Sequence, residues 1–85
     1  MTVTFFGDIS RFTNAESLTY DQVSNLQHLI DTLGADYGGD FKDYLLADGT
    51  VFFLVNGRSI LSTGGLKTPL EQDSVVNVLP HVEAG

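Results

Sequence analysis

Cysteine is missing from this chain of 85 residues, which excludes disulfide bridges, thiolate metal sites and thiol nucleophiles. Without cysteine ligands the chain also cannot hold an iron–sulfur cluster. Stability must therefore come from packing and hydrogen bonding within one small domain, which is what this length predicts. An apolar fraction of 42% is sufficient for a single modest core.

Basic residues are scarce, and the net charge is -7. Eleven acidic residues face only four basic ones, namely Arg11, Lys42, Arg58 and Lys67. Nucleic acid and anionic membranes are therefore disfavoured as partners, because binding to phosphate depends on Lys and Arg. A basic groove on another protein fits better, although acidity also keeps a small protein soluble. A signal peptide and a long apolar membrane run are not evident, so we expect a soluble cytoplasmic protein.

Patterns typical of catalytic and metal sites are not evident either. We find no Ser-His-Asp order and no His/Glu cluster, and Gly64-Gly65 is not followed by the Gly-Lys-Ser/Thr of a phosphate loop. Five aspartates lie between residues 31 and 48, without the spacing of a calcium-binding loop. We therefore expect no metal site and no bound cofactor. The aspartates form either a solvated acidic face or a docking patch for a basic partner.

The N-terminal half predicts two strands and one main helix. Residues 2–6 alternate and are rich in β-branched and aromatic residues, and residues 15–20 predict a short second strand after a loop. An apolar stripe at helical spacing follows, made of Val23, Leu26, Leu29, Ile30 and Leu33. Asp21 is the expected N-cap and Gly34 the expected stop. An earlier start, with Thr19 and Gln22 as a capping box, is the alternative.

The C-terminal half predicts a short helix and three strands. A flexible loop at 36–40 precedes the short helix around Phe41, and Asp48-Gly49 predicts a turn. Residues 50–55 are almost wholly apolar, as expected for a strand covered on both faces. Asn56-Gly57 predicts a type I′ hairpin with a return strand at 58–61. An irregular stretch at 62–70 and a turn at 71–73 then lead to a last strand at 74–79.

These elements predict an α+β fold, in which one mixed sheet packs on one main helix. If the first and last strands lie side by side in the centre of the sheet, the arrangement is a ubiquitin-like β-grasp. We expect a single β-grasp domain over residues 1–85, with a flexible C-terminal tail at 81–85.

The C-terminal residues suggest how such a domain could act. Val82, Glu83, Ala84 and Gly85 directly follow an apolar strand that ends near Pro80. A slender tail of this kind suits the delivery of its backbone carboxylate into the narrow active site of another protein. That carboxylate is ionised at neutral pH, since its ordinary pKa is about 3.3–3.7. It can therefore act as a nucleophile toward a phosphate of ATP.

Over its whole length the chain resembles the MoaD/ThiS family of small sulfur-carrier proteins. The resemblance depends on the order of the opening residues 3–7, the Val55-Asn56-Gly57 hairpin, the Thr68-Pro69-Leu70 segment and the closing residues 78–85. One departure stands out, because the family tail usually ends in Gly-Gly and this chain ends in Ala84-Gly85.

The resemblance implies a carrier that is a substrate of enzymes and not itself an enzyme. An E1-like adenylating enzyme would use ATP and magnesium to activate the Gly85 carboxylate, which then becomes a thiocarboxylate. Val82, Glu83 and Ala84 would form the tail that enters the enzyme, and Leu79 matches an apolar position that packs on partners in the family. The sequence itself adds His81, which lies near the tail and could contact a partner, with ordinary packing at the end of the strand as the alternative. The MoaD side of the family implies sulfur supply for molybdopterin, in complex with a molybdopterin synthase large subunit.

Three alternatives stay open at this point. The chain could be a thiamine-type sulfur carrier, or a ubiquitin-like modifier that is joined through Gly85 to lysines. It could also be a β-grasp interaction module without C-terminal chemistry, which Ala84 favours somewhat because alanine lacks the conformational freedom of glycine.

Overall fold

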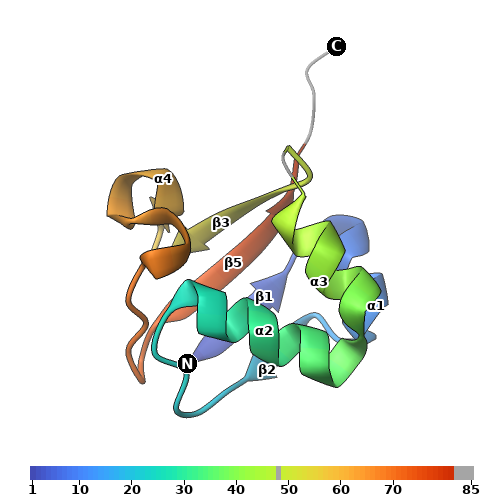
Figure 1. The fold of residues 1–85 in the computed structure, drawn as a ribbon, viewed down its shortest axis with the longest axis horizontal. Helices are drawn as coiled ribbons and strands as arrows, with labels where there is room; N and C mark the ends of the chain where they lie inside the picture. The colour runs from blue at the N-terminus through green and yellow to red at the C-terminus, as the bar shows by residue number, and fades with distance from the viewer. Residues whose placement is uncertain (48, 82–85) are drawn as a thin grey trace.

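The computed structural model describes residues 1–47 and 49–81, and its centre is a five-stranded mixed sheet (Figure 1). The strands are β1 (Thr2–Phe5), β2 (Ser17–Thr19), β3 (Val51–Val55), β4 (Arg58–Ser59) and β5 (Val75–Pro80). In the sheet they follow the order β2-β1-β5-β3-β4, so the last strand in sequence lies in the middle. β5 runs parallel to β1 and antiparallel to β3. The predicted α+β β-grasp, with its first and last strands side by side, is confirmed.

Two helices cover one face of the sheet, as Figure 1 shows in front of the strands. They are α2 (Leu26–Tyr37) and α3 (Gly39–Leu46), and shorter helical turns are η1 (Gly7–Ile9), α1 (Ser10–Thr13), α4 (Ile60–Thr63) and η2 (Gly65–Lys67). Four residues of the predicted apolar stripe, Leu26, Leu29, Ile30 and Leu33, lie on α2 and are fully buried, whereas Val23 precedes the helix. They belong to one core cluster with Val3 and Val76 of the two central strands. Among the helices of the described residues, none is long and apolar enough to cross a membrane.

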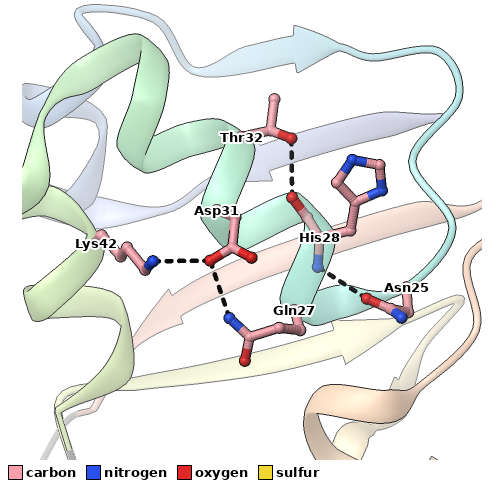
Figure 2. Close-up of polar contacts among 6 residues, drawn as sticks. All are labelled: Asn25, Gln27, His28, Asp31, Thr32 and Lys42. Carbon is pink, nitrogen blue, oxygen red and sulfur yellow. Dashed lines mark hydrogen bonds and ion pairs between the residues drawn. The ribbon is translucent and has the colours of Figure 1, made fainter.

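The main helix begins later than the sequence predicts, at Leu26, so Asp21 is not its N-cap. Asn25 caps it instead, because its side-chain oxygen accepts a hydrogen bond from the His28 backbone N–H at 2.8 Å (Figure 2). The backbone just before Asn25 is hydrogen-bonded to a distant segment, because the Leu70 N–H donates to the Ser24 carbonyl at 3.0 Å. This tertiary contact prevents an earlier start and also excludes the capping box that involves Gln22, whose φ is 60°.

Gly34 is not the end of the main helix either, since the helix continues to Tyr37 and only Gly38 separates it from α3. The predicted flexible loop at 36–40 is therefore wrong. A Cβ at Gly34 would lie 2.9 Å from the Cβ of Lys42, so glycine is needed here for the close approach of the two helices. The same lysine forms an ion pair with Asp31 at 2.8 Å, which joins α3 to α2 (Figure 2).

The hairpin at Asn56-Gly57 is confirmed, and both residues have positive φ, at 52° and 84°. The predicted return strand is too long, because β4 ends at Ser59. The Ser59 hydroxyl oxygen accepts the Leu61 N–H at 3.2 Å and starts α4 in place of further strand. The prediction that β3 is covered on both faces is also wrong, since Phe52 is 47% exposed. The predicted turn at Asp48-Gly49 includes Asp48, which lies outside the described residues.

Candidate functional site

The end of β5 determines where the C-terminal residues leave the sheet. His81 follows the strand, and its backbone N–H donates to the Thr50 carbonyl at 3.1 Å. Since alternate residues point their N–H groups to opposite sides of a strand, the nitrogen of Pro80 points away from β3, toward the side where β1 has already ended. A proline is therefore tolerated here without loss of a ladder hydrogen bond. Gly7 packs beside it, and a Cβ at Gly7 would lie 3.1 Å from the Pro80 ring.

Three side chains meet on the open face of the sheet next to this exit, and we call them the tail-root cluster: Phe52, Leu79 and His81. Phe52 lies directly opposite Leu79 in the β3–β5 ladder and diagonally opposite His81 on the same face. The rings of Phe52 and His81 meet edge to face, with centroids 4.9 Å apart and planes at 64°. Leu79 is partly buried and His81 is exposed.

A shallow apolar groove of about 230 Å³ continues from this cluster toward α4. Phe52 and His81 line one end of the groove, and Ile60 and Leu61 line the other. Leu61 is 87% exposed, and the same groove contains the exposed side chain of Phe52. Exposed apolar side chains that gather in one patch are typical of interaction sites. The end of β5 therefore stands beside a surface that favours contact with another protein.

Charge is divided unevenly between the two sides of the sheet. The five strands contain no acidic residue, whereas α2 and α3 carry Asp31, Asp36, Asp40 and Asp43. The Asp31 carboxylate accepts hydrogen bonds from Lys42 and Gln27, and these lower the pKa of Asp31. Asp36 accepts the Tyr20 hydroxyl at 3.0 Å, and burial together with this bond raises the pKa of Tyr20.

The structure describes two of the six predicted site residues, and it brings them together. Leu79 and His81 lie on one face at the end of β5. Val82, Glu83, Ala84 and Gly85 lie outside the described residues, so their predicted roles stay predictions. The sequence prediction missed Phe52, because a continuous apolar run suggests burial on both faces. The register of β3 opposite β5 is what reveals it.

No group of three or more His, Asp or Glu side chains is placed to hold a metal ion in the part of the chain that the structure describes. The four aspartates of this segment that the structure describes form no such group: Asp31 pairs with Lys42, and Asp36 pairs with Tyr20. Asp48 lies outside the described residues. The expectation that the protein binds no cofactor of its own stays a prediction.

The sheet order, the parallel central pair and the helix across one face define a ubiquitin-like β-grasp protein. The model of the ThiS family matches residues 3–85, and the chain therefore belongs to the ThiS family. It is a small ubiquitin-like sulfur carrier, as the resemblance of its sequence implied. No curated protein gives a significant match to the chain.

Solved structures support the same fold over nearly the whole chain. CysO from Mycobacterium tuberculosis is 25% identical with a TM-score of 0.82, and the match covers 95% of this chain and 98% of CysO. CysO in the Amycolatopsis orientalis BexX/CysO complex is 20% identical with a TM-score of 0.83, over 99% and 98% of the two chains. The HVO 2177 protein of Haloferax volcanii is 26% identical with a TM-score of 0.75, over 99% and 84%.

Proposed function

We propose that the protein carries sulfur as a thiocarboxylate on Gly85, and that an E1-like enzyme activates this residue. The observation that supports the proposal most directly is the match to the ThiS family, which extends to Gly85 itself. A carboxylate is a poor acyl donor, so it must first attack the α-phosphate of ATP and release pyrophosphate. A sulfide-level donor such as HS⁻ then attacks the acyl adenylate and displaces AMP, which gives the thiocarboxylate directly. A persulfide donor would first give an acyl disulfide, and a thiol must then reduce its S–S bond, leaving the thiocarboxylate and a new disulfide.

The roles of this chain and its partner follow from that chemistry. The partner holds ATP and magnesium, because phosphoryl and adenylyl transfer require a metal and precise positioning of the phosphates. This chain supplies Gly85 at the end of a narrow segment, Val82–Ala84, together with contacts from Leu79 and His81. Its net charge of -7 favours a partner with a basic surface around the entrance to the active site.

Within this function we propose molybdopterin synthesis as the first acceptor pathway to test. A Pyrococcus furiosus protein described as molybdopterin converting factor, subunit 1, is 20% identical with a TM-score of 0.73, over 95% of each chain. A molybdopterin synthase large subunit would then be a second partner, and this chain would act as its small subunit. Thiamine synthesis is the alternative acceptor pathway.

One comparison also favours a second function, in which Gly85 is joined to lysines of other proteins. The small archaeal modifier protein 1 of Methanosarcina acetivorans is 21% identical with a TM-score of 0.80, over 99% of this chain and 94% of the modifier. Both functions begin with the same activated carboxylate. They differ in what attacks the adenylate, which is a sulfur donor for a carrier and a lysine amine for a modifier.

The decisive experiment is to measure the intact mass of the chain after incubation with ATP, magnesium, a sulfur source and the E1-like enzyme from the same source. A carrier gains about 16 Da, since sulfur replaces one oxygen of the terminal carboxylate. A variant that lacks Gly85 is the matched control and must not gain this mass. An unchanged mass would contradict the carrier, and adducts on lysines of other proteins would then favour the modifier over an interaction module.

The same assay tests the departure at Ala84. We include an Ala84→Gly variant, which restores the Gly-Gly ending that is usual in the family. Glycine reaches backbone conformations that alanine does not, so this variant shows whether the partner requires them. If only Ala84→Gly gains mass, the wild-type chain is an interaction module and not an active carrier.

A further inference from the structure

The backbone and the side chain of His81 are held by two different contacts. Its N–H donates to the Thr50 carbonyl, and its imidazole packs against the ring of Phe52. Residues at the end of a domain usually fray unless they are tied down. His81 is exposed, so these two contacts are what fix its position.

Phe52 presents an aromatic side chain to the open face of the sheet. Its ring is 47% exposed on the open face, whereas Phe53, the next residue of β3, points into the core and is buried. A half-exposed phenylalanine contributes less to folding than a buried one, and a β-branched residue would suit this position of the strand equally well. The edge-to-face geometry with His81 is favourable and requires a ring at residue 52.

We propose that Phe52 is a positioning residue for activation of the carrier, and that it acts by holding His81 against the open face of the sheet. This inference rests on the proposed function. The four residues after His81 can span at most about 14 Å, so the point at which they start determines where the Gly85 carboxylate can reach. Catalysis is sensitive to small errors in the placement of a reacting group. A loose His81 would therefore slow the attack on ATP.

The test compares steady-state rates of adenylation, followed as release of pyrophosphate. The variants at residue 52 distinguish the need for an aromatic ring from the need for an apolar side chain. Phe52→Leu keeps an apolar side chain but loses the contact between rings, and we expect kcat to fall about three- to tenfold. KM should change by less than about twofold, because a residue that acts through His81 and does not itself touch the enzyme leaves binding of the carrier nearly unchanged. Phe52→Tyr keeps the ring and should restore the rate.

Two further variants connect the effect to His81. His81→Ala changes an exposed side chain, so it will fold, and it should reproduce the loss of kcat. In the double variant the two losses should not add, because both changes break the same contact. Val75→Thr is the matched control, since Val75 is 41% exposed on the same face but lies at the opposite end of β5.

A measurement on the free carrier supplements the kinetics. The NMR shifts of the His81 ring protons should change in Phe52→Leu and not in Phe52→Tyr, because an aromatic ring shifts neighbouring protons. Circular dichroism of each variant shows whether it has folded.

The outcomes separate the inference from the function on which it rests. If the wild-type chain is not adenylated, the proposed function is wrong and the inference falls with it. If the wild type is active and Phe52→Leu has the same kcat, the function stands and the inference is overturned. A rise in KM alone, or additive losses in the double variant, would make Phe52 a direct contact of the enzyme and would also overturn it.

Discussion

The two faces of the sheet differ in how deeply their apolar side chains are buried and in where acidic residues lie. On the covered face, apolar side chains of α2 and α3 such as Leu29 and Phe41 are fully buried, and the outer surfaces of these helices carry aspartates. On the open face, Phe52 and Val75 are exposed, and the strands contain no acidic residue. Burial of apolar area provides most of the stability, so the covered face holds the fold together.

The open face contributes less to folding and is therefore free to serve another purpose. Its apolar residues include Leu79, which lies near the point where the C-terminal residues leave β5. An acidic outer surface on the helices and a neutral apolar surface beside the chain exit would orient the protein toward a partner with a basic rim. Under the proposed function, stability and transfer therefore depend on opposite sides of one sheet, and substitutions should separate them.

The largest expected loss of stability comes from a substitution on the covered face of the sheet. Leu29→Ala removes a fully buried side chain from α2 and should lower the free energy of unfolding by about 2–5 kcal/mol, as measured by urea denaturation. The cost combines lost apolar burial with the cavity that remains. Phe52→Leu on the open face is the comparison, and it should cost less than about 1 kcal/mol. Equal losses of unfolding free energy for the two variants would show that both faces contribute equally to stability.

A smaller effect is expected where the two helices touch. Gly34→Ala places a methyl group 2.9 Å from the Cβ of Lys42, so the helices must separate. We expect a loss of about 1–2 kcal/mol in urea denaturation, because the strain exceeds the gain in helix propensity of about 1 kcal/mol. Gly39→Ala is the matched control, since nothing lies within 4 Å of a Cβ there. It should be neutral or stabilising, and a stabilising Gly34→Ala would contradict the close-packing explanation.

Much of the fold could be predicted from local patterns. Strong periodicity located the stripe of α2, and the Asn56-Gly57 pair fixed the hairpin. The two errors at the main helix share one cause, which is that tertiary contacts overrode the local signals, whereas the short return strand reflects a local cap at Ser59. The helix starts late because the Ser24 carbonyl accepts a hydrogen bond from the Leu70 N–H. Gly34 does not end the helix, and instead allows α3 to approach α2 closely.

The candidate site was predictable only in part, for a similar reason. The family resemblance predicted Leu79, and nearness to the C-terminal residues predicted His81, and the contacts of both with a partner stay predictions. Phe52 is 27 residues earlier than Leu79, and only the register of β3 against β5 places it beside them. An apolar run cannot show which of its members faces outward when the pattern does not alternate. The roles of Val82–Gly85 stay predictions, derived from the family resemblance.

The smallest effect tests the corrected start of the main helix. Asn25→Ala removes the side-chain oxygen that accepts the His28 N–H, and it should lower the free energy of unfolding by about 1 kcal/mol. Asp21→Ala is the matched control, because Asp21 is exposed and lies outside the helix, and it should change stability by less than about 0.5 kcal/mol. Urea denaturation of both variants decides between the two starts. A larger loss for Asp21→Ala would restore the start that the sequence alone predicts, whereas a larger loss for Asn25→Ala would show that Asn25 caps the helix and that it begins at Leu26.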